Sequence, residues 1–413
     1  MNIISELNWR GLAKQITNES KLLEAQKGSK AVYCGFDPTA SSLHVGHLMM
    51  IVTLQRFGKA GFKPIALIGG GTGMIGDPSF KSDERVLQTN EQVLTNVKAI
   101  EKQLRAIIPN VTFANNADWL NKMSLIDFLR DVGKDFTLSY LLAKESIATR
   151  IQTGLSITEF SYTMLQAYDF WHLYSNMDCK VQIGGSDQWG NITSGTDYIN
   201  SKVGRDNSQA AGFTIPLLVK SDGKKFGKTE SGAVWLDATK TSEYEFYQFW
   251  INQDDADCER MMKYLTFLSS EEIVNLQTQH NQAPTQRIMQ KQLASEITRF
   301  VHQQDGLDKA IKLTEAFFQG NITNLDKSLL KDALLAIPST TLKAETAIID
   351  AIVASKCASS KREAREFMKS NAITFNDIIV NDENLKLSAI PLLENEFILI
   401  KRGKRKYFGI KIS

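Results

Sequence analysis

Short apolar runs alternate with longer helical patterns over residues 30 to 219, and this alternation constrains the fold more than any other feature. The runs read AVYCGF, PIALIGG, CKVQIGG and FTIPLLV, and their length and composition are those of buried strands. Strands separated by helices lie parallel in one sheet, because each helix carries the chain back across it. The sequence therefore predicts an α/β fold in which residues 1–220 form a Rossmann-like domain around a parallel sheet.

The chain beyond this domain is predicted to have three further parts. Residues 221–320 hold a glycine-rich loop and then a helical domain, in which the aromatic side chains of TSEYEFYQFWINQDD pack a core. Residues 321–345 are predicted to be a linker, and residues 346–413 a small α+β domain. A chain of 413 residues with 43% hydrophobic content can bury two or three such cores.

Compartment and redox state are predicted from features that the sequence lacks. No run approaches the roughly 18 apolar residues of a membrane span, and the first residues, MNIISELNWRGLAK, contain no apolar signal core. The four cysteines have neither zinc-site nor disulfide spacing. We expect a cytoplasmic protein with reduced thiols at Cys34, Cys179, Cys258 and Cys357 and with no bound metal.

The C-terminal part is basic, although the whole chain carries a net charge of only +2. Residues 343–413 hold 13 lysines and arginines against 9 aspartates and glutamates. The positive charges concentrate in SSKREAREFMKS and KRGKRKYFGIK, and apolar residues interrupt both runs. This mixture favours a folded basic module over a disordered tail, which would be poorer in apolar residues.

A turn and a helix start follow the first predicted strand. AVYCGF runs into FDPTASSLHVGH, in which Asp37-Pro38 predicts a turn and Ser41 or Ser42 can cap a helix. Such a junction in a parallel sheet binds anions, because free backbone N–H groups and the positive end of the helix dipole point at them.

Two histidines and a glycine occupy the first turn of that helix. Residues three apart share one helix face, so His44 and His47 are expected to point into the same crevice. Gly46 leaves the backbone open for a flat ring to lie against it. These features favour a nucleotide site. Two alternatives are weaker: a pair of ordinary half-exposed histidines, and a metal pair, which lacks the glutamate of a zinc-protease motif.

The run GTGMIG, residues 71–76, matches the G-x-G-x-x-G pattern of dinucleotide-binding folds. In that pattern the third glycine lies inside a helix, whereas Asp77-Pro78-Ser79 follows Gly76 here and would break one. We therefore reject a dinucleotide-dependent dehydrogenase. The glycines are instead expected to let a ligand approach closely, with Asp77 as a fixed negative charge beside it.

The segment SDGKKFGKTESG, residues 221–232, is called the lysine loop below. Its glycine and turn residues predict a mobile loop, and Lys225, Lys228 and Thr229 supply two ammonium groups and a hydroxyl. Alone it could be an ordinary solvated loop. Because it follows a strand of the same sheet, it is predicted to close as a cationic lid over phosphates.

Together, PTASSLHVGH and KFGKT resemble the two signature motifs of class I aminoacyl-tRNA synthetases. The segments YCGFDPTA, GDPSFKSDER, TEFSYTMLQAYDF, QIGGSDQWGN and KFGKTESG resemble those of bacterial-type tyrosyl-tRNA synthetases in order and spacing. The likeness covers nearly the whole chain, and SSKREAREFM with ITFNDIIVND is similar to an S4-type RNA-binding module. The departures are small, since Val45 replaces a usual isoleucine and KFGKT is the subfamily's form of the lysine motif.

The resemblance implies a two-step ligase reaction. Tyrosine and ATP would give tyrosyl-adenylate and pyrophosphate, and tyrosine would then pass to the 3′ end of tRNA(Tyr). The substrate carboxylate is itself the nucleophile at the α-phosphorus, so orientation and charge stabilisation must supply the rate. Mg²⁺ would arrive with ATP, and no tightly bound cofactor is expected.

The resemblance also implies roles for residues at matching positions. A catalytic role on the triphosphate is implied for His44, His47, Thr39, Lys81, Arg85, Lys225, Lys228 and Thr229. Tyrosine binding is implied for Asp77, Asn116, Tyr162, Gln166 and Gln188, and for Tyr33 and Asp169 at the phenol. ATP binding is implied for Cys34, Gly35, Asp37, Gly46, Gly184, Asp187 and Lys228. RNA binding is implied for Lys361, Arg362, Arg365, Lys401, Arg402, Lys404 and Arg405.

Four alternatives remain open on the sequence alone. A tryptophan-specific relative shares the fold but should lack the Tyr33 and Asp169 pair. A small-molecule nucleotidyltransferase has little use for a basic C-terminal module. A catalytically silent RNA-binding paralogue would not need both histidines and both lysines. A generic α/β nucleotide-binding protein is all that the physical patterns require. The family further implies a homodimer without membrane association.

Overall fold

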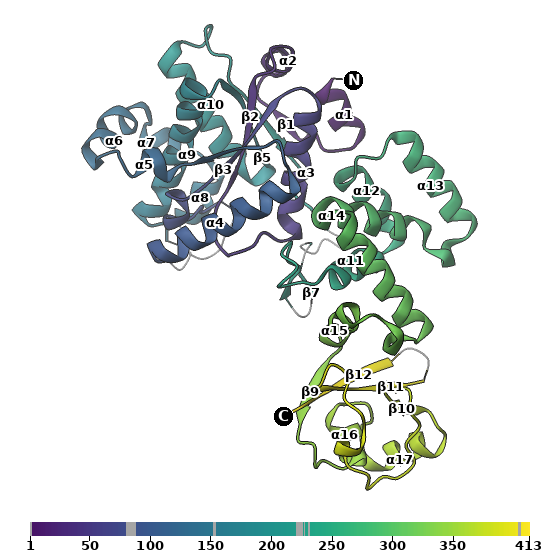
Figure 1. Cartoon of the computed structure of the whole chain (residues 1–413). Helices are drawn as coiled ribbons and strands as arrows, with labels where there is room; N and C mark the ends of the chain where they lie inside the picture. The colour runs from purple at the N-terminus through teal and green to yellow at the C-terminus, as the bar shows by residue number, and fades with distance from the viewer. Residues whose placement is uncertain are drawn as a thin grey trace. The chain divides into compact units, whose positions relative to one another are not determined.

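The computed structural model describes residues 2–79, 88–151, 154–219, 226, 228–229, 232–403 and 406–413. The chain divides into two compact units (Figure 1). Unit 1 comprises Met1–Thr241 and Trp250–Val301, and unit 2 comprises Ser242–Phe249 and His302–Ser413. The boundary therefore runs through two helices, α11 (Glu243–Ile251) and α14 (Ile288–Gln319).

Unit 1 is built on a six-stranded sheet of order β1-β6-β5-β2-β3-β4. Its strands are β1 (Gln15–Ile16), β2 (Ala31–Phe36), β3 (Lys63–Ile68), β4 (Thr112–Asn115), β5 (Cys179–Gly185) and β6 (Ala211–Ile215). All neighbouring pairs are parallel except β1 and β6, which run antiparallel at one edge. The predicted α/β fold is confirmed, and β1 is an edge strand that the apolar runs did not reveal.

The strand order reverses at β2, which sets the position of the crevice. From β2 the chain proceeds outward to β3 and β4, and it later returns to the other side of β2 to add β5 and β6. In an open parallel sheet the connections leave such a reversal in opposite directions, so a crevice opens beyond the carboxyl ends of the two strands. Here those ends are Phe36 of β2 and Gly185 of β5.

Helices cover both faces of this sheet (Figure 1). On one face α9 (Ile157–Asn176) and α10 (Trp189–Val203) bury Phe170 and Ile199 against Tyr33 of β2. On the other face α3 (Val45–Lys59) packs along β2 and β3, as right-handed crossovers in opposite directions require.

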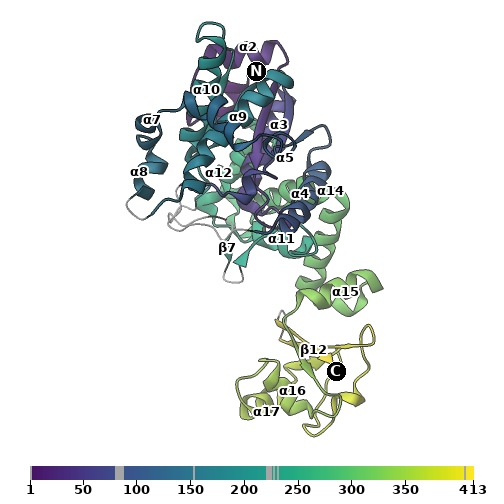
Figure 2. The ribbon, with the colours of Figure 1, turned by 90° about the vertical axis from the view of Figure 1, so that its left-hand side faces the viewer.

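The remaining helices and short strands of unit 1 surround these layers. They are α1 (Ile3–Trp9), α2 (Glu19–Lys27), α4 (Asn90–Ile107), α5 (Ala117–Leu120), α6 (Leu125–Asp131), α7 (Leu138–Leu142), α8 (Glu145–Ile151), α12 (Asp255–Leu265), α13 (Ser270–Gln282), β7 (Lys228–Thr229) and β8 (Gly232–Ala233). The short helices α7 and α8 contact each other and lie at the left edge of Figure 2.

Two buried arginines connect α12 to the rest of unit 1. Arg56 of α3 donates to the carbonyl oxygens of Tyr264 at 2.7 Å and Lys263 at 3.2 Å. Arg10, just after α1, donates to the Lys263 carbonyl at 3.0 Å. The last carbonyls of a helix have no intrahelical donor, so these guanidinium groups complete the C-terminal end of α12.

The glycine-rich run at residues 71–76 does not start an α-helix. It holds only a 3₁₀ turn, Thr72–Met74, and Gly76 has a φ of 91°, a conformation that favours glycine. A dinucleotide-binding fold needs a helix to begin at this point. The geometry therefore agrees with the rejection of that fold.

Unit 2 is built on a four-stranded sheet of order β10-β11-β12-β9. Its strands are β9 (Ser339–Leu342), β10 (Ile373–Phe375), β11 (Phe397–Arg402) and β12 (Lys406–Ile412), and its further helices are α15 (Lys327–Ala336), α16 (Ile348–Ala354) and α17 (Lys361–Lys369). In the described part of the chain, no helix has both the length and the apolar character that crossing a bilayer requires.

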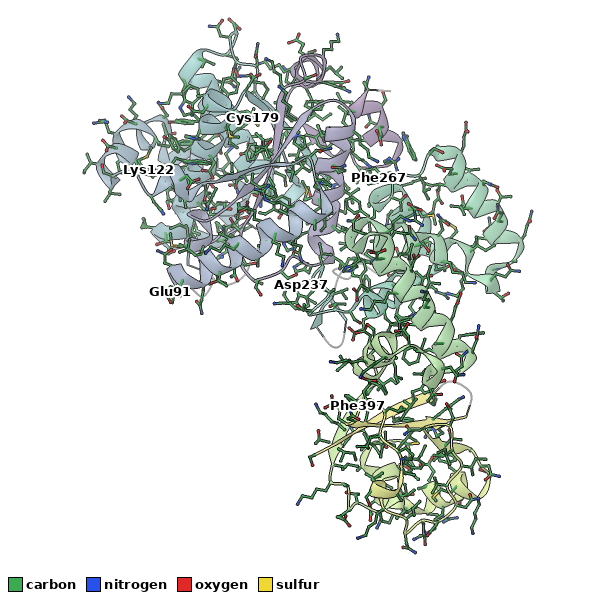
Figure 3. All side chains as sticks on the ribbon, viewed as in Figure 1. Glu91, Lys122, Cys179, Asp237, Phe267 and Phe397 are labelled. Carbon is green, nitrogen blue, oxygen red and sulfur yellow. The ribbon has the colours of Figure 1, made fainter. Side chains whose placement is uncertain are left out.

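Residues 321–345 do not form the linker that the sequence analysis expected. They contain α15 and β9, and Leu330 and Leu334 of α15 are buried with Phe397 and Leu399 of β11 in one core; Phe397 is labelled in Figure 3. The alternate residues of β11 face the other side of the sheet, where they pack with α16 and α17. The sheet therefore has a core on each face, and α15 supplies one of them.

Candidate active site

A cavity of about 340 Å³ opens at the carboxyl ends of β2 and β5, where the strand order predicts it. Many of the residues that the sequence analysis selected line it. They are Tyr33, Cys34, Gly35, Asp37, Thr39, Gly46, His47, Asp77, Asn116, Tyr162, Gln166, Asp169, Gly184, Asp187 and Gln188. The predicted tyrosine-binding and ATP-binding residues thus share one space.

One predicted catalytic residue is described outside the cavity lining, and the side chains of five others are not described. His44 stands beside the cavity, at the start of the helix that borders it. Lys81, Arg85 and Lys225 lie outside the described residues, as do the side chains of Lys228 and Thr229.

The two histidines cap α3 in place of the predicted serines. His44 is the N-cap residue, and its Nδ1 accepts a hydrogen bond from the backbone N–H of Gly46 at 3.0 Å. The Nδ1 of His47 accepts from the backbone N–H of His44 at 3.2 Å. Because each Nδ1 accepts, each neutral imidazole carries its proton on Nε2. The helix start therefore presents two N–H donors, which suit an anionic ligand.

Gly46 is required by this arrangement. A Cβ on Gly46 would stand 2.7 Å from Cε1 of His44, closer than real Cβ atoms approach a neighbour. The ring that lies against Gly46 in the structure is therefore that of His44. The rings of His44 and His47 have their centroids 4.1 Å apart.

Side chains of α4 hold the loop between β2 and α3. Asn96 donates to the carbonyl oxygen of Pro38 at 3.0 Å. Gln103 accepts from the backbone N–H of Leu43 at 2.8 Å and donates to Ser42 Oγ at 3.1 Å. Sequence reasoning did not select Asn96 or Gln103, because nothing local distinguishes them from other polar residues of an amphipathic helix.

The backbone after the lysine loop pairs with the backbone ahead of α3. The N–H of Val45 donates to the carbonyl of Val234 at 3.0 Å, and the N–H of Leu236 donates to that of Leu43 at 2.9 Å. These two bonds attach one end of the lysine loop to the histidine segment. The residues that follow the lysine motif are thus neighbours of the histidine motif in space, although about 190 residues separate them in the sequence.

Four carboxyl groups, those of Asp37, Asp77, Asp169 and Asp187, line the cavity. The hydroxyl of Tyr162 donates to Asp37 at 3.0 Å, and the amide of Gln188 donates to Asp77 at 2.7 Å. Burial raises the pKa of Tyr162 well above its ordinary value, and the nearby carboxylates raise it further. This negative potential would attract the ammonium group of an amino acid.

Asp169 is held at one end of the cavity by two donors. Asn116 Nδ2 donates to one carboxylate oxygen at 2.9 Å, and Trp119 Nε1 donates to the other at 2.8 Å. Burial raises the pKa of Asp169 to about 7, although both hydrogen bonds oppose that shift. The resemblance implied that Asn116 binds tyrosine, but its amide donates here to Asp169 and, at 2.9 Å, to Thr72. Trp119 was not predicted at all.

Tyr33 lacks a hydrogen-bond partner at the same end of the cavity. Its side chain is 1% exposed, and no described residue bonds its hydroxyl. Burial raises its pKa well above the ordinary value, and Asp169 contributes further. Gln182 of β5 stands next to Tyr33 in register, and its Oε1 is also buried without a described partner. Buried polar atoms are rarely left unpaired, so this end is suited to a ligand with its own hydroxyl.

The described residues supply no metal cage. None of their histidine, cysteine, aspartate and glutamate side chains gather in a group of three or more that could hold an ion.

The predicted RNA-binding residues of α17 are accessible. The side chains of Lys361, Arg362 and Arg365 are 53%, 90% and 50% exposed. Each forms an ion pair with a carboxylate of unit 2, which exposed solvent weakens.

The basic residues of the β11–β12 hairpin have structural contacts. Lys401 donates to the carbonyl oxygen of Gly320 at 3.0 Å, and Arg402 donates to that of Cys357. Lys404 and Arg405 lie outside the described residues. Of the predicted set, α17 therefore offers the more available charges.

Two family descriptions match the chain. Residues 25–319 match "tRNA synthetases class I (W and Y)", and residues 330–410 match "Tyrosine--tRNA ligase SYY-like C-terminal domain". The chain is 69% identical to the tyrosine--tRNA ligase of Mesoplasma florum, over 100% of both chains. It is 64% identical to that of Mycoplasma capricolum, over 100% of this chain and 99% of the relative.

Solved structures agree with the fold. A C-terminally truncated mitochondrial tyrosyl-tRNA synthetase of Aspergillus nidulans has 30% identity and a TM-score of 0.69, with 77% of this chain and 94% of that chain covered. A tryptophanyl-tRNA synthetase of Encephalitozoon cuniculi, at 12% identity and a TM-score of 0.55 over 74% of this chain and 87% of that chain, shares the fold alone.

The pKa of Asp169 leads to a prediction on stability. Its value of about 7 in the folded chain exceeds the ordinary 3.8, so the folded state binds the proton more tightly. Unfolding free energy should then fall as pH rises from about 4 through 7, by an amount on the order of a few kcal/mol. Asp169→Asn should remove this decline, as measured by urea unfolding at pH 5 and pH 8 without substrate.

Asp206→Asn provides the control, since it removes an exposed carboxylate from the connection between α10 and β6. It should keep the wild-type dependence on pH. An Asp169→Asn variant whose stability changes with pH as the wild type does would contradict the assignment.

Proposed function

The chain belongs to the tyrosine--tRNA ligases of class I, so it joins tyrosine to tRNA in an ATP-dependent reaction, and we propose that the cavity binds tyrosine and ATP side by side. The observation that carries this proposal is the buried, unpartnered hydroxyl of Tyr33 near the carboxylate of Asp169. A substrate phenol would accept a hydrogen bond from Tyr33 and donate one to Asp169. Both protein groups would then be satisfied.

The ammonium of tyrosine would bind in the acidic part of the cavity. Asp77 supplies the negative charge, and Tyr162 and Gln166 line the cavity beside it. Gln188 holds Asp77 by a hydrogen bond of 2.7 Å, which orients the carboxylate. Asn116 acts in this proposal by positioning Asp169, not by binding the ammonium.

ATP, as its Mg²⁺ complex, would bind where the histidines cap α3. The Nε2–H groups of His44 and His47 and the positive end of the α3 dipole would face the triphosphate, with Thr39 beside them. Adenosine would lie along the strand ends, at Cys34, Gly35, Asp37, Gly46, Gly184 and Asp187. The family resemblance adds Lys81, Arg85, Lys225, Lys228 and Thr229 to the phosphate contacts.

The reaction then needs orientation more than acid–base groups. The carboxylate oxygen of tyrosine attacks the α-phosphorus, the bond between that phosphorus and the bridging oxygen breaks, and pyrophosphate leaves with the electron pair. In the second step the terminal hydroxyl of tRNA attacks the carbonyl carbon of the adenylate, and AMP leaves. Fixed donors stabilise the charge that develops on the leaving phosphates. We also propose a cytoplasmic location, where tRNA is charged for translation.

The test is the amino-acid-dependent exchange of pyrophosphate into ATP, measured for each amino acid in the wild type and in Tyr33→Phe. The wild type should respond to tyrosine far more than to phenylalanine or tryptophan. Tyr33→Phe should narrow the tyrosine-over-phenylalanine preference about tenfold, the worth of one neutral hydrogen bond. Its thermal stability should stay near the wild-type value, because the lost hydroxyl has no described partner.

Tyr174→Phe is the matched control, because it removes a tyrosine hydroxyl that accepts from the backbone N–H of Gln209, at a residue that does not line the cavity. It should leave the preference unaltered. An unchanged ratio in Tyr33→Phe would remove Tyr33 from the phenol site, and exchange supported equally by tryptophan would refute the assignment of the pocket.

We propose that the chain forms a homodimer through the short helices of unit 1. Exposed apolar side chains gather on α6, α7, α8 and the start of α9, which contribute to one core beneath them. They are Leu125, Ile126, Leu129, Leu138, Leu142, Ile151 and Ile157, with exposures from 43% to 83%. A concentration of exposed apolar residues marks an interaction surface.

Ile157→Asp should dissociate such a dimer. The residue is 83% exposed, so the change should leave the monomer folded. At an interface, an unpaired carboxylate costs on the order of 3 kcal/mol, which raises the dissociation constant about a hundredfold. Analytical ultracentrifugation measures the change. Val274→Asp, on α13 and 58% exposed, is the control that should stay dimeric; a dimeric Ile157→Asp would place the interface elsewhere.

We propose that α17 contacts tRNA through its exposed charges. Arg362→Ala should raise the KM for tRNA and reduce the slope of log affinity against log salt by about one, because one phosphate contact is lost. Pyrophosphate exchange should not change. Lys327→Ala, which removes an 81% exposed charge from α15, should leave both quantities alone. An unchanged salt slope in Arg362→Ala would argue against this surface.

A further inference from the structure

A tight turn follows the lysine loop and projects one lysine toward the loop ahead of α3. The carbonyl of Asp237, labelled in Figure 3, accepts from the N–H groups of Lys240 and Thr241, each at 3.0 Å. Its side chain accepts from the N–H of Thr239 at 2.9 Å, and Thr241 Oγ1 accepts from the N–H of Trp235 at 3.0 Å. The turn is thus built by its own hydrogen bonds, and Lys240 occupies a defined place in it.

The ammonium of Lys240 is held beside the segment that precedes α3. Its Nζ donates to Ser41 Oγ at 2.7 Å and lies 4.9 Å from the ring centroid of Trp235. That indole packs against the ring of His44, with centroids 6.0 Å apart and the planes at 65°. Ser41 lies between Thr39 and His44 in the sequence. Every described contact of Lys240 therefore belongs to the segment that precedes α3 or packs against it.

Lys240 has no carboxylate partner among the described residues. Other lysines of unit 1 do have one, such as Lys30 with Asp178 at 2.9 Å and Lys202 with Asp135 at 2.7 Å. An ammonium has three N–H donors, so two of them remain after the bond to Ser41.

The surroundings of Lys240 add positive potential. The start of α3 carries the positive end of its dipole, and His44 and His47 present their Nε2–H groups there. A cation beside such a helix start is repelled unless an anion binds between them. The contacts with Ser41 and Trp235 hold the ammonium there nonetheless. This arrangement is typical of a phosphate site.

We propose that Lys240 binds the terminal phosphate of ATP and, after activation, the pyrophosphate that leaves. The proposal rests on the proposed function, which places the triphosphate at Thr39 and His44. An RNA phosphate is less suited, because the contacts of Lys240 lie with the segment assigned to ATP. The turn is joined to the loop ahead of α3 by the bonds of Val45 and Leu236 and by Lys240 itself. Lys240 is therefore in place before ATP binds, so its charge acts on ATP affinity more than on the chemical step.

The experiment compares Lys240→Ala and Lys240→Arg with the wild type, as full-length chains. Pyrophosphate exchange provides the KM values for ATP, pyrophosphate and tyrosine together with kcat. Lys240→Ala should raise the KM for ATP and that for pyrophosphate about tenfold, because one charge-assisted hydrogen bond is lost. The KM for tyrosine should not change, and Lys240→Arg should restore most of the affinity.

Lys59→Ala is the matched control. Lys59 also lies over an aromatic ring, 3.7 Å from the centroid of Phe267, but it is in the last turn of α3, at the opposite end from His44. Its loss should leave all four constants at wild-type values. Titration of ATP into each protein by calorimetry measures the same affinity without turnover.

Three results would overturn the proposal. Unaltered affinities for ATP and pyrophosphate in Lys240→Ala would remove the phosphate contact. A rise only in the KM for tRNA would make Lys240 an RNA contact. Losses of similar size in all constants, with a lower melting temperature and no rescue by arginine, would assign it a structural role. A wild type without tyrosine-dependent exchange would refute the proposed function instead, and the calorimetric comparison would still decide the role of Lys240.

Discussion

The buried guanidinium of Arg56 fixes the position of α3, and the candidate site depends on that helix. A buried charge is costly unless it is fully hydrogen-bonded. Arg56 meets most of this need with the carbonyls that end α12, while its Nε, which has no hydrogen-bond partner among the described residues, lies 3.9 Å from the carboxylate of Glu6. Burial lowers the pKa of Arg56 only to about 9, so it stays charged at neutral pH. The other end of α3 is held by backbone pairing with Val234 and Leu236. Because both ends are fixed, the histidines cannot move independently of the segment that follows the lysine loop.

The cavity has two features that a ligand would stabilise, its negative charge and the buried hydroxyl of Tyr33, and each matches one part of a tyrosine molecule. Four carboxyl groups line the cavity and raise the free energy of the empty site, and an ammonium would lower it. Tyr33 is buried without a described partner, and a phenol relieves that. Such a site binds an amino acid well only when the ligand has both an ammonium and a phenol. An amino acid without the phenol is rejected, because a buried protein group then stays unpaired. Rejection of phenylalanine by tyrosyl-tRNA synthetases is a well-known example of this effect. In this chain Tyr33 and Asp169 would produce it.

The parts that sequence reasoning predicted depend on local pattern. Strands β2, β3, β5 and β6 are apolar runs with few alternatives, and many residues to which the resemblance assigns a binding role line one cavity at or beside these strands. The serine cap was wrong because Gly46 leaves room for the His44 ring to reach the backbone, so the histidine displaces the usual capping residue. The identity of the N-cap residue of α3 thus depends on the contacts of the His44 ring and not on the general preference of helices for serine at this position.

Other features depend on partners far away in the chain, which no local pattern contains. Trp119 has its role because α9 brings the carboxylate of Asp169 to its indole N–H. A linker was expected at residues 321–345, but Leu330 and Leu334 pack against β11. Gln182 became notable only through its register with Tyr33. In each case the sequence shows a residue with the right chemistry, and the tertiary fold decides what it touches.

The Lys240 turn ends where the first segment of unit 1 ends, and the chain passes there into unit 2. Unit 2 begins at Ser242, directly after Thr241. Within unit 2, Tyr244 stacks on Phe317 with ring centroids 4.9 Å apart, and Lys309 pairs with Glu243 at 3.2 Å. The segment that leaves the turn is thus anchored at once in the unit that carries α17.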